Sequence, residues 1–384
     1  MKRINAEKLN GVLSERLAFN LETARTAGTE LAVFQSGKEI CHLTDGWKDY
    51  DKQIKLTRGC LYRLASMTKP ITAVAALLGV QNGWFDLNDR LCDHLPEFSD
   101  MKVAADNGDG TYRIDHDAES DIRIYQCLSH CNGIFAETPL GNMIYENTPK
   151  SAYTSLKSMV EYTATQPLAF DPGTYTAYTG YASFDAVMRI IELKSGMSYE
   201  EFIRKYIFEP LGIKDITFHP TKEQWDRMVS MHDRTDGKSL VTVNMGKHIF
   251  ESNPLDYTCA GAGLAGSLED YSKFALMLCS KGSYNGIRVL DEKLVEEMKT
   301  ARVPDDIPGR NPNDSWGIGV RVKVHEDWLP EGVFGWSGAY GTHFWVDYEN
   351  EIVGILLRNM RWYDTHGCGM MGEEFEKDVM RCLE

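Results

Sequence analysis

The chain has 384 residues, and its 43% hydrophobic and 25% charged residues are ordinary for a soluble globular protein, which argues against disordered and fibrous classes. The formal net charge of −15 repels phosphate backbones and anionic lipids, so we expect no nucleic-acid partner and no membrane-surface role. No apolar stretch reaches the length of about 18 residues that a transmembrane helix needs. The first residues are charged and lack an apolar core, so we expect no signal peptide and predict a cytoplasmic protein.

The cysteines and histidines give no sign of a metal site. Nine cysteines are scattered along the chain, and an odd number outside a secretory context is typical of free thiols. Cys127 and Cys131 are close in sequence, but no second Cys/His pair completes a zinc site, and no His-Glu-x-x-His motif occurs. We therefore expect neither a metal nor a cofactor.

Both ends of the chain predict a helix together with antiparallel strands. Residues 5–27 form an amphipathic helical pattern, and the apolar runs 31–34 and 40–43 flank a turn in the manner of a β-hairpin. The C-terminal counterparts are a half-buried strand, a hairpin and an amphipathic helix: residues 316–324, residues 343–348 with 352–357, and the face formed by Met371, Phe375 and Val379.

The middle of the chain has a different character. Residues 181–193 and 199–207 have helical periodicity, and no clear succession of strands occurs there. The acidic stretch 105–121 is expected to be a solvated loop or a hairpin excursion.

These patterns predict an α/β (α+β) fold in which both chain ends supply one antiparallel sheet flanked by helices. The sheet domain would comprise residues 1–80 and 256–384. An inserted, mainly helical domain would comprise residues 81–255, with the active site between the two domains.

The segment with the clearest chemistry is Arg63-Leu64-Ala65-Ser66-Met67-Thr68-Lys69-Pro70, which leads into an apolar run with helical spacing. We expect Ser66 where this helix begins, with Lys69 one turn further on the same face. A serine needs a nearby base to act as a nucleophile, and a lysine whose pKa is lowered can supply one. The spacing alone is a weak signal, because Ser99 and Lys102 repeat it without opening an apolar helix, and Ser66 could simply cap the helix.

Two further segments change the balance. The run Asp171-Pro172-Gly173-Thr174-Tyr175-Thr176-Ala177-Tyr178 places a tyrosine after a Pro-Gly turn, and Gly335-Trp336-Ser337-Gly338-Ala339-Tyr340-Gly341-Thr342 precedes a strand. Together with the Ser66 segment, these resemble the serine β-lactamase and penicillin-binding-protein superfamily, over most of the chain and in the family order. The resemblance is closest to the class C-like branch and, within it, to the family VIII carboxylesterases.

The resemblance implies roles for individual residues. Ser66 would be the acylated nucleophile, and Lys69 and Tyr178 would be the proton-transfer pair. The backbone N–H groups of Ser66 and Ala339 would form the oxyanion hole. Which of Lys69 and Tyr178 takes the serine proton stays open at this point, because their titrations are coupled.

Several residues compete with these assignments. Tyr145 and Tyr348 each begin a Tyr-x-Asn string like that of the family, but neither follows a Pro-Gly-Thr turn, so we interpret both as chance matches. Tyr178 could instead bury its ring in the helical region. His130 could act in acid–base catalysis, although a structural histidine satisfied by local hydrogen bonds is the expected alternative.

The sequence also departs from the family pattern. Position 180 is Gly where the β-lactamases carry Asn, and Trp336 stands where they carry the lysine of Lys-Thr-Gly. We expect Trp336, Ser337 and Gly338 to line the substrate pocket, although Trp336 could be core packing. An indole has one N–H and no charge, so it cannot replace a lysine that binds a carboxylate. Arg358 could restore anion binding or could be an ordinary strand-end cation.

The sequence therefore predicts a serine carboxylesterase whose partner is a small, uncharged ester with a short acyl group. The first alternative is a β-lactamase or D-stereospecific peptidase of the same superfamily, which nitrocefin hydrolysis would distinguish. The second is a catalytically silent binding or regulatory relative, in which a fluorophosphonate would fail to label Ser66.

Overall fold

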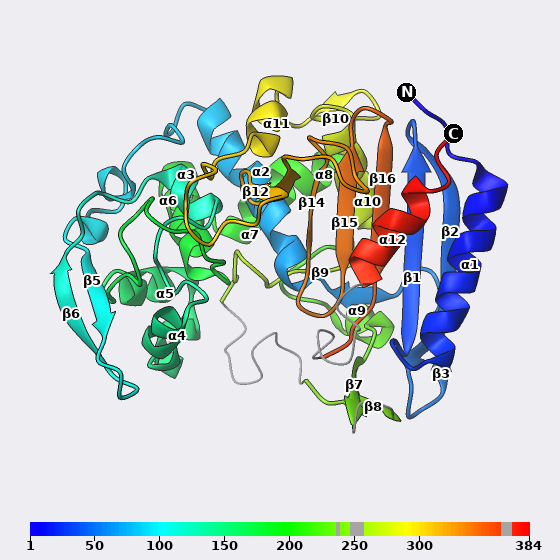
Figure 1. Cartoon of the computed structure of the whole chain (residues 1–384), viewed down its shortest axis with the longest axis horizontal. Helices are drawn as coiled ribbons and strands as arrows, with labels where there is room; N and C mark the ends of the chain where they lie inside the picture. Colours follow the sequence, from blue (N-terminus) through cyan, green and yellow to red (C-terminus); the bar gives the residue numbers. More distant parts are fainter. Residues whose placement is uncertain (236–238, 246–256, 362–370) are drawn as a thin grey trace.

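The computed structural model describes residues 1–235, 239–245, 257–361 and 371–384, and its largest sheet is antiparallel with eight strands (Figure 1). The strands lie in the order β12-β13-β14-β15-β16-β1-β2-β3. Their bounds are Asp314–Trp316 (β12), Arg321–Lys323 (β13), Phe334–Ser337 (β14), His343–Asp347 (β15), Ile352–Leu357 (β16), Gly28–Gln35 (β1), Lys38–Asp49 (β2) and Ile54–Lys55 (β3). Both chain ends supply this sheet, which confirms the predicted fold class.

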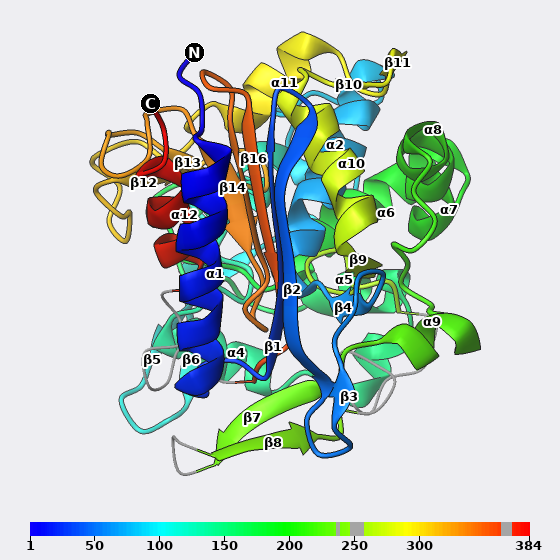
Figure 2. The same cartoon turned by 90° about the vertical axis from the view of Figure 1, so that its right-hand side faces the viewer.

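Helices cover both faces of the sheet (Figure 2). The terminal helices α1 (Ala6–Glu22) and α12 (Met371–Met380) lie on one face, and α2 (Thr68–Gln81) and α10 (Leu268–Cys279) lie on the other. Apolar side chains of α1 and α12 pack with those of the sheet, including the fully buried Trp345. The amphipathic patterns predicted at the two chain ends are therefore confirmed, because each helix buries its apolar face against the sheet.

Several of the remaining helices, among them α3, α4, α5 and α6, lie beside the sheet on the left of Figure 1. The bounds of all the remaining helices of the described chain are Ile124–Leu128 (α3), Pro139–Glu146 (α4), Leu156–Thr163 (α5), Ala182–Ser195 (α6), Tyr199–Ile203 (α7), Glu209–Leu211 (α8), Lys222–Arg227 (α9) and Glu292–Lys299 (α11). The helical periodicity predicted at 181–193 is α6, and that at 199–207 begins as α7 and continues as a π-helical turn. The residue limits of the two domains stay a prediction.

Four two-stranded sheets complete the described strands. They pair β4 (Leu61–Arg63) with β9 (Ala265–Ser267), β5 (Lys102–Asp106) with β6 (Tyr112–Asp117), β7 (Met231–Thr235) with β8 (Ser239–Val243), and β10 (Ser283–Tyr284) with β11 (Ile287–Arg288). The β5–β6 pair shows that the acidic stretch belongs to a hairpin. The β7–β8 pair was not predicted, so the middle region is less purely helical than we expected.

The single strand predicted over residues 316–324 is wrong. β12 ends at Trp316 and β13 begins at Arg321, and these two residues pair with each other across a tight turn. Gly319 within the turn has φ +69°, in the left-handed region that glycine adopts without steric cost. The apolar alternation continues through the turn, so the pattern alone could not reveal the reversal.

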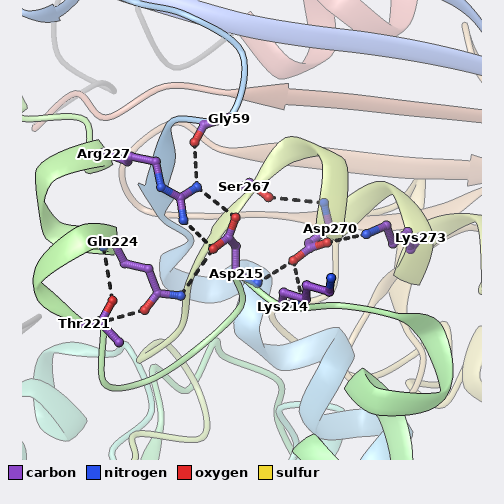
Figure 3. A network of polar contacts seen from close by, with 9 residues as sticks. All are labelled: Gly59, Lys214, Asp215, Thr221, Gln224, Arg227, Ser267, Asp270 and Lys273. Carbon is purple, nitrogen blue, oxygen red and sulfur yellow. Dashed lines mark hydrogen bonds and ion pairs between the residues drawn. The ribbon is translucent and has the colours of Figure 1, made fainter.

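A polar network fixes the segments that lead toward Ser66 (Figure 3). The buried Asp270 carboxylate, on α10, accepts hydrogen bonds from the backbone N–H groups of Lys214 and Asp215. Asp215 in turn pairs with Arg227 of α9, which also donates to the Gly59 carbonyl just before β4. Through Asp215 and Arg227, Asp270 therefore ties α10 to the strand that precedes the Ser66 turn.

Candidate active site

Ser66 lies in a turn between a short strand and a long buried helix. β4 ends three residues before it, residues 65–67 form a 3₁₀ turn, and α2 begins at Thr68. The α-helix that we predicted to begin at Ser66 therefore begins two residues later. Ala65 has φ +47°, a strained value for a residue with a side chain, and such strain is frequent at functional sites.

Lys69 is fully buried in the first turn of α2, and its Nζ lies 3.3 Å from the Ser66 Oγ. The first twelve residues of α2 are all buried, so the amine has no direct access to water. Burial lowers the pKa of Lys69 from 10.5 to about 7, because a charged ammonium is costly to desolvate. The predicted Ser66–Lys69 pair is thus brought together, with the lysine in the environment that a base requires.

Two backbone carbonyls from distant segments hold the Lys69 amine. Its Nζ donates to the carbonyl of Gly180 and, at 3.0 Å, to that of Gly261. A Cβ at Gly261 would lie 2.4 Å from the Gly180 carbonyl oxygen, so only glycine allows the two segments to approach this closely. The buried Asp185 carboxylate accepts a hydrogen bond from the Ala260 N–H at 2.8 Å and fixes the second carbonyl. No local pattern in the sequence pointed to Gly261.

Tyr178 reaches the same point from the middle of the chain. Its hydroxyl donates to the Ser66 Oγ at 2.6 Å, and the Lys69 Nζ lies 4.6 Å from the centroid of its ring. Trp336 donates its indole N–H to the Tyr178 hydroxyl at 3.3 Å. Burial raises the pKa of Tyr178 above its usual value of 10.0, so the phenol stays protonated at neutral pH.

The turn that follows β14 packs against the segment leading to Ser66. Thr342 donates its hydroxyl to the Leu64 carbonyl at 2.9 Å, and the Gly338 N–H donates to the Thr342 carbonyl at 2.7 Å. A Cβ at Gly338 would lie 2.3 Å from the Leu64 oxygen, so this approach also requires glycine. The exposed Ala339 follows Gly338 directly, next to the point where this turn contacts the segment before Ser66.

Aromatic rings form one wall beside Ser66. The half-buried Trp336 faces Tyr178, and its ring meets that of Trp316 edge-on with the centroids 4.4 Å apart. We expected Ser337 to line the pocket beside Trp336, but it is the next residue of β14 and points to the other face, where its hydroxyl contacts His343. Trp316 was predicted only as part of a strand, and the sequence carries no signal that it would lie against Trp336.

The two competing tyrosines lie in other surroundings. The Tyr145 hydroxyl accepts hydrogen bonds from those of Tyr153 and Tyr181, and the three phenols form a cluster of their own. The Tyr348 hydroxyl donates to the Leu278 carbonyl at 2.7 Å. Neither contacts Ser66, in agreement with the interpretation of both strings as chance matches.

His130 and Arg358 are both enclosed by the protein. His130 Nδ1 accepts a hydrogen bond from the Thr179 N–H at 3.0 Å, and burial lowers the pKa of this histidine well below 6.5. The Arg358 guanidinium is 1% exposed and donates to the carbonyls of Arg25 and Gly341. These contacts favour a structural histidine that supports the ring of Tyr178, and they engage Arg358 within the fold rather than at the pocket.

Two general properties hold for the described ranges 1–235, 239–245, 257–361 and 371–384. Every helix within them is too short or too polar to cross a membrane. No group of three or more His, Cys, Asp or Glu side chains within them is arranged to hold a metal ion.

Sequence and structure comparisons relate the chain to known proteins. A sequence model of the family Beta-lactamase matches residues 12–361. Protein Rv1367c from Mycobacterium tuberculosis (strain ATCC 25618 / H37Rv) is 27% identical over 349 residues, which cover 86% of this chain and 85% of that protein.

Two solved structures share the architecture. The LovD6 mutant of simvastatin synthase (LovD) from Aspergillus terreus matches with a TM-score of 0.81 at 20% identity, covering 98% of this chain and 97% of that one. EstCE1, a hydrolase with promiscuous acyltransferase activity, matches with a TM-score of 0.79 at 18% identity, covering 98% of both chains. At these identities the two structures establish the fold alone.

Proposed function

The chain belongs to the beta-lactamase family, whose relatives are serine hydrolases and acyltransferases, and on that premise we propose that it hydrolyses small, uncharged carboxylic esters through an acyl-enzyme on Ser66. The observation that carries the proposal is the position of the Ser66 Oγ, 2.6 Å from the Tyr178 hydroxyl and 3.3 Å from the Lys69 Nζ. A serine held between a phenol and an amine is equipped to lose a proton as it attacks.

The donors fix the direction of the hydrogen bonds that join Trp336, Tyr178 and Ser66. An indole N–H can only donate, so the Trp336 N–H occupies a lone pair of the Tyr178 oxygen. The Tyr178 O–H then donates to the Ser66 oxygen. The hydroxyl proton of Ser66 is therefore free to point toward the Lys69 nitrogen.

The surroundings of Lys69 match a neutral amine. A neutral amine has two N–H groups and one lone pair, and the carbonyls of Gly180 and Gly261 take the two N–H groups. In the ammonium form the third N–H donates to the Ser66 Oγ, and in the neutral form a lone pair faces that oxygen. With its pKa near 7, a large fraction of Lys69 is neutral at physiological pH, whereas burial keeps Tyr178 protonated. These directions favour Lys69 as the general base and Tyr178 as a hydrogen-bond donor.

The reaction then proceeds in two balanced steps. The Ser66 oxygen attacks the ester carbonyl carbon while its proton moves to Lys69, and the C–O bond to the alcohol breaks as the alcohol takes the proton from the Lys69 ammonium. Water then attacks the acyl-enzyme and gives a proton to Lys69. The Ser66 oxygen leaves with that proton, which releases the carboxylic acid and restores the starting state.

The backbone supplies the groups that stabilise the oxyanion. In the described part of the chain, the N–H groups of Ser66 and Ala339 donate to no protein acceptor, so both are available to a developing oxyanion. Loss of one such donor typically costs about 3–4 kcal/mol of barrier.

The pocket wall supports an uncharged substrate. Trp336 occupies the position of the lysine that holds a substrate carboxylate in penicillin-recognising relatives, and its N–H is already engaged by Tyr178. A missing charge-assisted hydrogen bond costs an anionic substrate about 1.5–3 kcal/mol. The aromatic faces of Trp316 and Trp336 instead offer apolar contact.

Hydrolysis of p-nitrophenyl acetate and p-nitrophenyl butyrate tests the proposal. We expect turnover of both esters and its complete loss in Ser66→Ala, with nitrocefin hydrolysed poorly or not at all. Ester turnover that persists in Ser66→Ala would refute the acyl-enzyme. Efficient nitrocefin turnover would instead favour the lactamase alternative, and the absence of Ser66 labelling by a fluorophosphonate would favour a catalytically silent protein.

A second candidate function is acyl transfer to an alcohol. It is favoured by a sequence relative, ML-236A carboxylate methylbutanoyltransferase mlcH from Penicillium citrinum, which is 29% identical over 212 residues, 55% of this chain and 50% of that protein. In this case an alcohol replaces water in the second step. Adding methanol to the p-nitrophenyl butyrate assay distinguishes the two, because transfer yields methyl butyrate while hydrolysis yields only butyrate.

A further inference from the structure

A chain of buried polar contacts runs behind β14, on the sheet face opposite Ser66. Ser337 points away from the aromatic wall, and its hydroxyl lies 2.9 Å from His343 Nδ1. His343 Nε2 lies 3.0 Å from the Glu376 carboxylate, which belongs to the C-terminal helix α12. His343 is 3% exposed and Glu376 is 0% exposed, so water cannot replace these contacts.

The charge state of Glu376 follows from the groups that contact it. Burial acts to raise the pKa of Glu376, but the charge of Arg321 and the hydrogen bond from His343 outweigh it and hold that pKa at about 2. Trp328 also donates its indole N–H to Glu376, at 2.9 Å. An ionised carboxylate only accepts, so His343 carries a proton on Nε2.

Three elements hold the side chains of this contact. The Ser337 hydroxyl of β14 lies 2.9 Å from His343 Nδ1 of β15. His343 Nε2 donates to the Glu376 carboxylate of α12, which also pairs with Arg321. Because partners from β14, β15 and α12 meet in a buried site, the contact is rigid.

The rigid contact lies at the base of the turn that carries Ala339. Ser337 and His343 are directly paired across β14 and β15, and the chain reverses between them. The N-terminal end of α12 packs on the histidine, because a Cβ at Gly372 would lie 3.0 Å from the His343 ring. On the opposite side, Thr342 ties the turn to the segment before Ser66.

We infer that Ser337, His343 and Glu376 are positioning residues that hold the turn between β14 and β15 so that the Ala339 N–H meets the oxyanion formed at Ser66. The inference rests on the proposed function, and it gives the C-terminal helix a role in the reaction. An N–H that is displaced by even a fraction of an ångström stabilises the transition state less while leaving ester binding largely intact.

Substitution of His343 tests this inference through kcat and KM for p-nitrophenyl butyrate. In His343→Leu we expect kcat to fall about tenfold with KM within about twofold, because the oxyanion forms only in the transition state. His343→Gln retains one donor and one acceptor, so we expect it to recover most of the wild-type kcat. Affinity for a boronic acid that forms a tetrahedral adduct on Ser66 should fall by the same factor as kcat.

A double-mutant cycle separates positioning from general stability. If His343 acts through Ser337, His343→Leu should have little further effect on kcat in the Ser337→Ala background. His42→Leu is the matched control, because His42 is another histidine of the sheet that contacts carboxylates, those of Glu30 and Glu39. We expect this control to lower the melting temperature without changing kcat.

The outcomes are distinct. A wild-type kcat in His343→Leu would overturn the inference, as would equal losses in His343→Leu and His343→Gln that are additive with Ser337→Ala. Should His343→Leu fail to fold, the comparison of Ser337→Ala with His343→Gln still tests the contact. Ester turnover by Ser66→Ala would overturn the proposed function instead, and this arm is measured in the same assay.

Discussion

The chain contains two Ser-x-x-Lys segments, and the structure places them in opposite environments. Lys69 is fully buried in α2, with its amine beside Ser66 and backbone carbonyls. Ser99 is exposed, and Lys102 lies in the surface hairpin, where about a third of its side chain is accessible to water. The same four-residue spacing therefore occurs once in the protein interior and once at its surface.

The charges around the two amines differ as much as their burial does. Lys102 forms ion pairs with Asp117 and Asp100, and these carboxylates raise its pKa. Burial lowers the pKa of Lys69 to about 7. Only Lys69 is therefore available as a neutral base at physiological pH, so the environment and not the spacing decides which segment can carry chemistry.

The sharpest test of this comparison is the removal of the buried amine. We expect Lys69→Met to lower kcat for p-nitrophenyl butyrate by about 10³–10⁴-fold, because the serine loses its base while the helix keeps a side chain of similar length. Steady-state kinetics and fluorophosphonate labelling of Ser66 both report the loss. Activity within tenfold of wild type would assign the base elsewhere.

Removal of the phenol should have the next largest effect. In Tyr178→Phe the ring remains, but Ser66 loses a hydrogen-bond donor, and we expect kcat to fall about 10²-fold. Tyr145→Phe is the matched control, since it makes the same change in a Tyr-x-Asn string that does not contact Ser66. If both variants lose activity equally, the distinction between the two tyrosines is wrong.

The pH dependence of kcat/KM tests the environment of Lys69 directly. The folded protein needs the neutral amine, so kcat/KM should rise with pH through a midpoint near 7 and then reach a plateau. One pH unit below that midpoint, we expect about a tenfold loss relative to the plateau. An acid limb near the usual value of 10.5 would mean that Lys69 is not desolvated as the structure indicates.

We expect the surface segment of Ser99 and Lys102 to have no role in catalysis. Ser99→Ala and Lys102→Met remove the second motif, and we expect kcat and KM within about twofold of wild type, because the contacts of Lys102 are exposed ion pairs that contribute little to stability. Their melting temperatures should also change little. A large loss of ester hydrolysis in either variant would contradict the assignment of activity to Ser66.

Much of the fold follows from local pattern. The helix of Leu9 and Leu13, the two hairpins and the closing helix were predicted from local sequence. An amphipathic element shows its apolar face in its own residue pattern, whichever apolar surface it packs against. The error at residues 316–324 has a physical cause: Gly319 reverses the chain, but an alternating pattern has the same period on both sides of a turn. The β7–β8 hairpin was missed because the residues of β8 are at most half-buried and show no clear alternation.

The candidate site also contains residues that local sequence predicts and residues that it does not. Ser66 lies in the 3₁₀ turn that leads into α2 and Lys69 in the first turn of α2, so their proximity follows from their spacing. Tyr178 and Trp336 were predicted only through resemblance to a family, since nothing in local sequence brings residues so far apart to one serine. His343 and Glu376 carried no signal, because a buried hydrogen bond between a strand and a C-terminal helix leaves no periodic trace.

Composition, periodicity and the Ser66–Lys69 spacing were thus determined by the sequence itself, because they depend on neighbours within a few residues. Only the tertiary structure decided that Lys69 is buried, that the carbonyls of Gly180 and Gly261 take its N–H groups, and that Tyr178 and Trp336 complete the chain of donors. The reason is that burial and hydrogen-bond direction depend on packing between segments that are distant along the chain, and these two properties decide whether an amine can accept a proton.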